Sequence, residues 1–466
     1  AIPLQLIFFH SACEFQDNRS AKERASRMSV VYQERFSRIE AVLLLEKEKI
    51  DIDELRASCS YGVPDLLRPL VWRLLLDYLP AERASWKAHL KAQRENYDTL
   101  VEQLIVTPSQ QHQQGDHPLS DDAESNWGAF FADNTTLSQI NKDVRRLCPE
   151  IQFFQLNTCF PHRSAAYANL SARVTATDLE TRDYHIHRMG EARLKSSIKK
   201  RAPDAYSKPP EPGSEAHWQV AERILFIYSK LNPGVKYVQG MNEVLGPLYY
   251  VFASDPDTEW AEHAEADCFY CFQHVMSEIK DNFIKSLDDS CCGIEQSMAS
   301  FHSLLEHFDP LLYTHLVRSL SIRPQYYAFR WLSLMLSQEM PLPDVITLWD
   351  ALFSDPKRFT LLPYVCLAML EREREQLLNG DFSDCLRLLQ NYPDADAQQL
   401  VMSAYGIREG RIRPVSVVEE AGGKSKSTLK SPTAISPTQE QSPRSGKANI
   451  SDKIADKLRQ MNFIRK

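Results

Sequence analysis

Apolar residues recur at helical spacing through almost the whole of residues 29–409, and breaks at proline and aspartate separate one run from the next. No segment shows the alternation of apolar and polar residues that is typical of a strand, and 15 glycines are few for 466 residues. These patterns argue against an all-β or a dinucleotide-binding α/β architecture. We therefore expect an all-α fold.

The chain divides into a helical body and a polar tail. We leave residues 1–28 unassigned, and expect an N-terminal helical segment at 29–61 followed by a single large multi-helical domain at 62–409. Within that domain, residues 157–214 are the least patterned and are interpreted as a solvated, variable insertion. Residues 410–466 are rich in serine, proline and lysine, which predicts a disordered tail with a short amphipathic helix at its end.

Two helix boundaries in the body are predicted from local signals. Residues 29–60 are expected to form one helix, because their apolar residues recur without a proline. Asn134 or Thr135 is expected to cap a later helix, which ends at Cys148 and Pro149.

Charge is distributed unevenly along the chain. The net charge is −8, but residues 411–466 hold 12 basic and 5 acidic residues, a net charge of +7 that leaves −15 for residues 1–410. An acidic body and a basic tail with few aromatic residues argue against nucleic-acid binding. The apolar face of Ile450, Ile454, Leu458 and Met461 has two interpretations: contact with a membrane surface or a partner, or a solvated helix without a target.

Composition also limits the compartment and the kinds of site. No uninterrupted apolar run reaches the ~18 residues of a membrane span, and ten cysteines in a chain of this length do not indicate a disulfide scaffold. Cys268, Cys271 and His274 fall on one helix without a second cysteine pair, which favours a buried helical face over a metal site. We expect reduced thiols and a cytoplasmic protein, with peripheral contact to endomembranes left open.

One candidate site residue is an arginine beside an aspartate. Asp143 and Arg146 are three positions apart and therefore neighbours on a helix surface. Arg146 lies off the apolar face that Ile140 shares with Leu137 and Val144, so we expect it to project outward while Asp143 restricts its rotamers. Taken alone, the pair favours a different interpretation, an ordinary surface ion pair worth ~0.2–0.5 kcal/mol.

A second candidate is Gln239, which lies between a helix stop at 232–234 and a new helix after Gly240. The glycine allows close approach by another molecule, and Tyr237 is expected to anchor the loop in the core. A loop glutamine with no task would explain the local pattern as well. Farther upstream, Arg68 and Trp72 are four positions apart, so the guanidinium can lie along the indole face, and we expect this pair to brace the domain and the Gln239 loop.

These residues form three ordered motifs, Arg-x-x-x-Trp at 68–72, Ile-x-x-Asp-x-x-Arg at 140–146 and Tyr-x-Gln at 237–239. Together they resemble the TBC domain, a helical module that accelerates GTP hydrolysis by Rab GTPases. Further segments at 329–331 and 342–350 resemble the same family, and the resemblance spans roughly residues 40–405. It departs at 157–214 and in the tail.

The resemblance implies a mechanism with two residues supplied in trans to a GTP-bound Rab. Arg146, steered by Asp143, would neutralise charge between the β- and γ-phosphates, and Gln239 would orient the attacking water. GTP and magnesium would belong to the GTPase, so the chain would need no cofactor of its own and would be a GTPase activator that regulates vesicle trafficking. The supporting residues would be Arg68, Trp72, Ile140, Tyr237, Gly240 and Asn242.

One alternative is a catalytically silent Rab-binding or scaffold protein that uses the same helical surface. The presence of both Arg146 and Gln239 favours the activator. The chain has no Gly-x-Ser-x-Gly, no His-Glu-x-x-His and no complete P-loop motif, which argues against a free-standing enzyme.

Overall fold

The computed structural model describes residues 30–43, 48–105, 126–166, 169–174, 213–284 and 293–414. Regular structure in these ranges is helical, apart from two isolated bridges that pair Lys49 with Glu82 and Asn157 with Ala216. The expected all-α fold is therefore confirmed. The predictions for residues 1–28 and for the tail beyond 414 lie outside the described residues.

Three helices form the N-terminal part of the described chain: α2 (Val30–Val42), α3 (Ile52–Cys59) and α4 (Arg68–Leu75). The prediction of one helix over residues 29–60 is wrong. The carboxylate of Asp51 accepts hydrogen bonds from the backbone N–H groups of Asp53 and Glu54, each at 3.0 Å. Asp51 has the extended backbone of a capping residue, so a new helix begins there.

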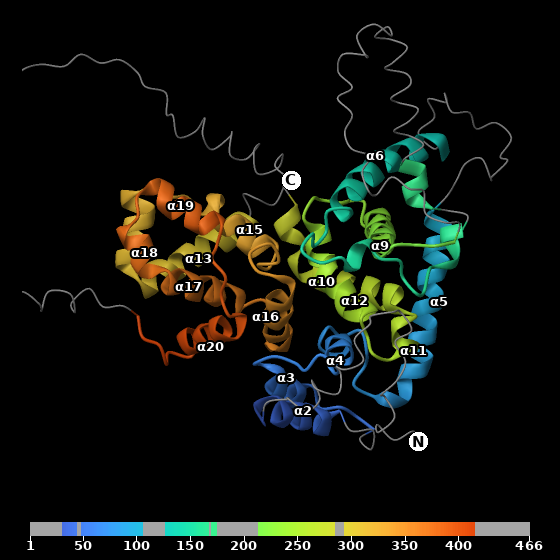
Figure 1. The fold of residues 1–466 in the computed structure, drawn as a ribbon, viewed down its shortest axis with the longest axis horizontal. Coiled ribbons are helices and arrows are strands. Elements are labelled where there is room, and N and C mark those ends of the chain that lie inside the picture. Colours follow the sequence, from blue (N-terminus) through green and yellow to red (C-terminus); the bar gives the residue numbers. More distant parts are fainter. Residues whose placement is uncertain are drawn as a thin grey trace, which may run out of the picture.

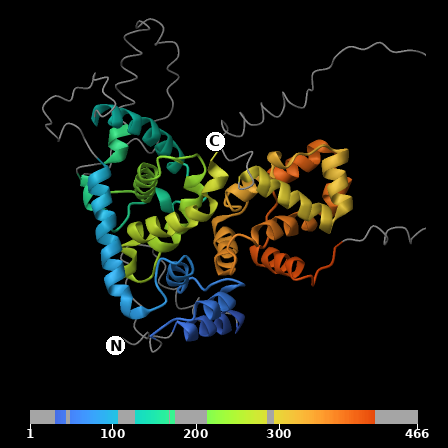
Figure 2. The same cartoon turned by 180° about the vertical axis from the view of Figure 1, so that it is seen from behind.

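The middle of the chain supplies a second group of helices: α5 (Trp86–Leu104), α6 (Asn126–Val144), α9 (His217–Leu231), α10 (Met241–Ala253), α11 (Thr258–Ala261) and α12 (Ala264–Ile279). Helices α9, α10 and α12 contact one another, α6 packs on α9 and α10, and α5 packs on α9 and α12. Figures 1 and 2 show α5 along the outer edge of this group and α6 at its top.

Helix α6 begins at Asn126, so the prediction that Asn134 or Thr135 caps it is wrong. The hydroxyl of Thr135 lies 3.5 Å from the carbonyl of Phe131, one turn earlier in the same helix. Between these two residues, Asp133 accepts a hydrogen bond of 2.9 Å from Lys230 of α9. This tertiary contact supports the first half of α6, which capping signals in the sequence do not reveal.

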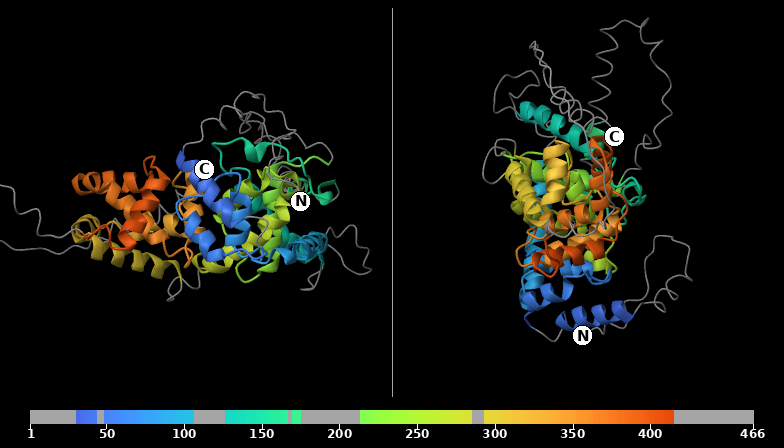
Figure 3. Two further views of the ribbon diagram at one scale, coloured as in Figure 1. Left: turned by 90° about the horizontal axis from the view of Figure 1, so that it is seen from below. Right: turned by 90° about the vertical axis from the view of Figure 1, so that its left-hand side faces the viewer.

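The last third of the described chain forms a third group: α13 (Ile294–Phe308), α14 (Pro310–Tyr313), α15 (Ala328–Ser333), α16 (Leu342–Ser354), α17 (Leu362–Arg372), α18 (Arg374–Asn379), α19 (Phe382–Gln390) and α20 (Ala397–Arg408). Helix α16 contacts α3, α4, α10 and α20, and so joins all three groups. Seen from the side, α6 and the α2–α3 pair lie at opposite ends of the molecule (Figure 3).

The described part of the predicted insertion, residues 157–166 and 169–174, packs onto the body. Leu170 and Val174 are buried, and the hydroxyl of Ser171 donates a hydrogen bond of 2.7 Å to Glu222 of α9. Leu170 and Val174 belong to the hydrophobic core and in this differ from the solvated insertion expected for 157–214, whereas Asn157, Cys159, Phe160 and Arg163 are exposed. Residues 175–212 lie outside the described residues.

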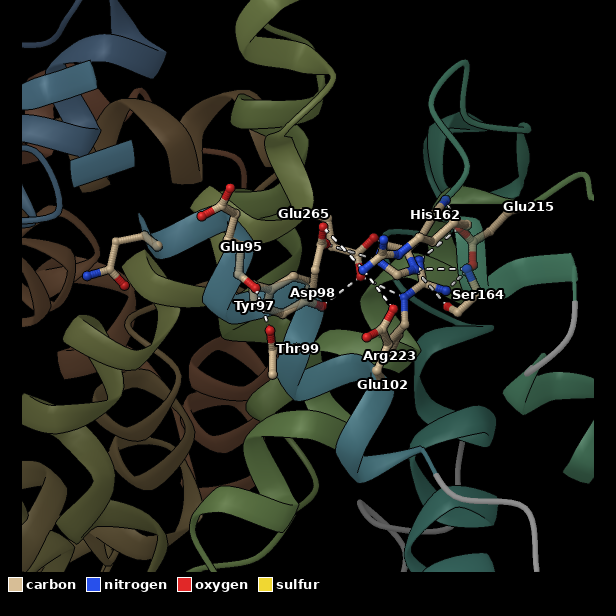
Figure 4. A network of polar contacts seen from close by, with 12 residues as sticks. Glu95, Tyr97, Asp98, Thr99, Glu102, His162, Ser164, Glu215, Arg223 and Glu265 are labelled. Atoms are coloured by element: carbon tan, nitrogen blue, oxygen red, sulfur yellow. Dashed lines mark hydrogen bonds and ion pairs between the residues drawn. The ribbon is translucent and has the colours of Figure 1, made fainter. Parts of the chain in front are cut away.

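A buried ionic cluster holds α9 in place. Arg223 of α9 donates to Glu265 of α12 at 2.6 Å and to Glu215 at 2.9 Å, and the hydroxyl of Tyr97 in α5 also donates to Glu265 at 2.6 Å. Burial alone would lower the pKa of Arg223, but the charges and hydrogen bonds of Glu265 and Glu215 together outweigh it and raise that pKa well above its usual range. Figure 4 shows this cluster with His162, whose backbone N–H donates to Glu215. The cluster fixes the helix on which α6 rests.

Candidate functional site

Arg146 lies just beyond the end of α6, where the helix tightens. Its backbone N–H donates to the carbonyl of Asp143 at 3.1 Å. Its side chain is held at two points, with Nε donating to the Lys142 carbonyl and Nη2 donating to Asp143 Oδ1, both at 3.0 Å. The side chain is nevertheless 45% exposed, whereas that of Asp143 is 6% exposed. Arg146 is therefore a restrained guanidinium that a partner can reach.

Three consecutive side chains at this helix end point in different directions. Arg145 turns back onto α9, where its Cζ lies 4.5 Å from the centroid of the Trp218 ring. Leu147 packs under α10, and a Cβ added at Gly246 would come within 2.9 Å of it. Only Arg146 is directed outward. Of these two adjacent arginines, Arg145 therefore packs against the protein and Arg146 faces the solvent.

Gln239 lies on the loop between α9 and α10 and is exposed. Gly240, which follows it, has φ 107°, in the left-handed region that favours glycine. A Cβ at Gly240 would lie 2.8 Å from Leu334 Cδ2, so the loop is pressed against a side chain from the third group of helices. From the sequence we expected Gly240 to allow close approach by another molecule. In the structure its close neighbour is Leu334 of the same chain.

A buried chain of polar groups connects the two candidate residues. Tyr237 lies 2.9 Å from Asp143 Oδ2 and 3.2 Å from Asn242 Oδ1, through its hydroxyl in both cases. We assign its single proton to the carboxylate, the closer and charged acceptor. Asn242 Oδ1 also accepts the backbone N–H of Gly240 at 3.2 Å. Asp143 therefore restrains Arg146 with one oxygen and the Gln239 loop, through Tyr237, with the other.

Burial changes the pKa values of both groups in this connection. Burial raises the pKa of Asp143, while hydrogen bonds from Tyr237 and Arg146 oppose that rise. Burial, followed by the nearby Asp143 charge, raises the pKa of Tyr237 well above its usual range, so the phenol stays protonated and remains a donor. Ile140 is fully buried on α6 and belongs to the hydrophobic core.

Arg68 and Trp72 meet at a residue that the motifs did not single out. Both donate to the buried carboxylate of Asp350 on α16, Arg68 through Nε at 3.1 Å and Trp72 through Nε1 at 2.7 Å. The structure joins them through this shared acceptor, whereas stacking was expected. They lie where α4 meets α16, so they brace the domain there, while the Gln239 loop rests on Asp143 and Leu334. An aspartate in so apolar a helix was the available signal for this partner.

The residues that could hold a metal give no support for a metal centre. Cys268 and Cys271 are fully buried on α12, and burial raises the pKa of both thiols. Within the described ranges, no group of three or more His, Cys, Asp or Glu residues is arranged to hold a metal ion. Those ranges also contain no helix of the length and apolarity needed to span a membrane.

A second buried chain lies behind α6, and sequence analysis missed it. Asn141 Nδ2 donates to Glu222 Oε1 at 2.6 Å, and Asn141 Oδ1 accepts from Arg145 Nε at 2.9 Å. The other oxygen of Glu222 accepts from Ser171 at 2.7 Å. Burial is the main cause that raises the pKa of Glu222 from 4.5 to about 7.

The raised pKa of Glu222 predicts a stability change with pH. Between pH 4.5 and 7 the folded protein holds this proton and the unfolded chain does not, so stability falls as the pH rises through this window. The full change is about 3 kcal/mol at about 1.4 kcal/mol per pKa unit. Glu222→Gln, which imitates the protonated carboxyl, is expected to remove this share, as measured by urea unfolding at pH 5, 6, 7 and 8.

Glu371 on α17 provides a matched control, because burial also raises its pKa to about 7. Glu371→Gln is expected to remove only its own share of the pH dependence and to leave that of Glu222. A stability profile of Glu222→Gln parallel to that of the wild type would contradict the prediction.

Comparisons with known proteins identify the family of the chain. A family model described as the Rab-GTPase-TBC domain matches residues 183–378. TBC1 domain family member 13 of Mus musculus and of Homo sapiens are each 46% identical to the chain over 404 residues, which is 82% of this chain and 100% of each relative. A TBC domain-containing protein of Schizosaccharomyces pombe is 32% identical over 456 residues, covering 82% of this chain and 73% of its own.

One solved structure extends the comparison to the fold. The crystal structure of the Ypt/Rab-GAP domain of Gyp1p matches with a TM-score of 0.58 and 22% sequence identity. The match covers 83% of this chain and 100% of that chain. At this identity the likeness concerns the arrangement of the helices.

Proposed function

The chain belongs to the family of proteins that carry a Rab-GTPase-TBC domain, and on that premise we propose that it accelerates GTP hydrolysis by a Rab-family GTPase. The observation that carries the proposal is the double contact of Asp143, which binds Arg146 directly and the Gln239 loop through Tyr237. The family model matches residues that include Gln239 and begin after Arg146. The role of Arg146 therefore depends on its motif and its geometry.

Arg146 acts as the residue that balances phosphate charge. Two of its nitrogens are used to fix the side chain, and the exposed remainder of the fork is free to meet oxygens of the nucleotide. A guanidinium that is already oriented loses little entropy when it engages, so it stabilises the charge that develops in the transition state. An arginine supplied in trans to Ras accelerates hydrolysis by roughly 10³–10⁵-fold, or about 4–7 kcal/mol.

Gln239 acts as the residue that positions the attacking water. A carboxamide both donates and accepts hydrogen bonds, so it can orient a water molecule without taking its proton. Its loop is restrained at Tyr237 and at Gly240, on either side of the glutamine. Because Asp143 binds Arg146 directly and the Gln239 loop through Tyr237, the positions of Arg146 and Gln239 relative to each other are set before a partner arrives.

The partner carries the nucleotide. GTP and its magnesium ion belong to the GTP-bound Rab, which supplies the phosphate chemistry. The chain supplies the two polar side chains and a rigid helical support. By shortening the lifetime of the GTP-bound Rab, it would regulate vesicle trafficking.

The alternative function is a catalytically silent protein that binds a Rab through the same surface. A panel of GTP-loaded Rab proteins, each mixed with the wild type or with Arg146→Ala/Gln239→Ala under single-turnover conditions, separates the two. We expect the wild type to accelerate hydrolysis on at least one member by about 10³-fold or more, and the double variant to lose this effect. Equal rates with the two proteins on every member would contradict the proposal.

A further inference from the structure

The last turn of α6 needs an anchor if Arg146 is to be presented in one place. Helix ends have unpaired backbone groups and open more readily than helix centres. Beyond Val144 the backbone tightens, with N–H groups of Arg146 and Leu147 donating to carbonyls three residues earlier, at 3.1 and 3.2 Å. Cys148 then adopts a positive φ of 43°, which ends the turn. The position of Arg146 therefore depends on what holds these few residues.

Arg145 holds them through three contacts, of which the one with Trp218 is made to α9. Its guanidinium carbon lies 4.5 Å from the centroid of the Trp218 ring, and its Nε donates to Asn141 Oδ1 at 2.9 Å. Its backbone carbonyl accepts from Gln155 Nε2 at 3.3 Å. The side chain is thus sandwiched between an aromatic face of α9 and a polar group of its own helix.

Arg145 and Glu222 together determine which way Asn141 faces. Arg145 Nε can only donate, so Asn141 turns its oxygen toward Arg145 and its NH₂ group toward Glu222, which accepts at 2.6 Å. Glu222 is itself fully buried and receives a second hydrogen bond from Ser171. Each donor from Glu222 through Asn141 to Arg145 therefore meets an acceptor. The Arg145 guanidinium donates to an Asn141 oxygen that is already oriented toward it.

We propose that Arg145 is a positioning residue, which pins the last turn of α6 to α9 through Trp218, Asn141 and Glu222 and thereby sets the orientation of Arg146. The catalytic half of this inference rests on the proposed function. A guanidinium is required because its planar face covers the indole while its Nε–H reaches Asn141, and the compact ammonium of a lysine cannot make both contacts at once. Small errors in the placement of a catalytic group cost up to about 10²-fold in rate.

Hydrogen exchange tests the pinning without any GTPase. In Arg145→Ala, amide exchange in peptides covering residues 143–148 is expected to be about 10- to 30-fold faster than in the wild type, the change that loss of one hydrogen bond and one cation–π contact would give. Exchange in α12 is expected to stay unchanged. Arg387→Ala is the matched control, because Arg387 is 76% exposed on α19 and pairs only with the exposed Asp384. Unchanged exchange at 143–148 would overturn the proposal.

Kinetics test the consequence for Arg146 on the Rab that the wild type accelerates best. Arg145→Ala is expected to lower kcat about 10- to 10²-fold with little change in KM, because binding surfaces remain while the orientation of Arg146 is lost. Trp218→Ala should lower kcat as Arg145→Ala does, whereas Trp218→Phe, which keeps an aromatic face, should retain most of the wild-type kcat. The double variant Arg145→Ala/Trp218→Ala should be no slower than either single variant. Strictly additive losses, or a normal kcat in Arg145→Ala, would overturn the inference.

The two tests also separate this inference from the proposed function. If the wild type accelerates no Rab, the proposed function fails, and the exchange experiment still decides whether Arg145 pins the turn. If the wild type is active and Arg145→Ala is equally active, only the positioning role fails.

Discussion

Replacing Arg146 with lysine is expected to slow stimulated GTP hydrolysis almost as much as replacing it with alanine, by about 10³-fold or more. The reason is the geometry at the end of α6, where Nε and Nη2 bind the Lys142 carbonyl and Asp143 while the rest of the fork stays exposed. A lysine ammonium is a single point of charge, so it cannot be held by two protein acceptors and still present a planar face to phosphate oxygens.

Single-turnover hydrolysis at saturating activator measures this effect separately from binding. The affinity of each variant for the GTP-bound Rab is expected to change little, since the interaction removed is made mainly in the transition state. Arg387→Ala, a change of the same kind on the exposed face of α19, is expected to keep the wild-type rate. Near-normal hydrolysis with Arg146→Lys would exclude the role assigned to this guanidinium.

Replacing Asp350 with alanine is expected to lower the free energy of unfolding by about 3–5 kcal/mol. Its buried carboxylate accepts hydrogen bonds from Trp72 at 2.7 Å, from the backbone N–H of Val63 at 2.8 Å and from Arg68 at 3.1 Å. Alanine would remove the buried counter-charge of a largely buried guanidinium, which would keep only the exposed Asp65 as its acidic partner. It would also leave two donors, Trp72 Nε1 and the Val63 N–H, unsatisfied. Urea unfolding followed by circular dichroism measures the loss.

Two variants show whether the buried charge is responsible. Asp350→Asn keeps one acceptor oxygen and removes the charge, so its loss should lie between those of the wild type and Asp350→Ala. Asp384→Ala removes a carboxylate whose partner Arg387 lies 2.8 Å away on the exposed face of α19, and should cost under about 1 kcal/mol. If Asp350→Ala and Asp384→Ala lower the free energy of unfolding by similar amounts, the buried contacts of Asp350 with Arg68 and Trp72 do not hold α4 against α16.

Predictions that depend on neighbouring residues agree best with the structure. Apolar spacing predicted the helical body, because a helix forms from contacts within a few positions and shows its buried face as a local period. The spacing of Asp143 and Arg146 predicted a contact that the structure contains at 3.0 Å. The catalytic roles given to Arg146 and Gln239 stay predictions, which the hydrolysis experiments address.

Predictions that required knowledge of distant contacts did less well. The helix expected over 29–60 is an exception, because it failed on a local signal: Asp51 caps α3, and its capping pattern was present in the sequence. The start of α6 at Asn126 is supported by the pairing of Asp133 with Lys230, 97 positions away. The burial of Leu170 and Val174 likewise depends on packing around α9.

The sequence by itself determined that this chain is helical and which arginine stands one turn from an aspartate, since both follow from spacing within a few residues. The tertiary structure decided what those residues do for one another. Tyr237 reaches Asp143 across 94 positions, and Arg68 reaches Asp350 across 282. Contacts of this kind have no period in the sequence, because they arise only when separate helices pack and a buried polar group must find its partner.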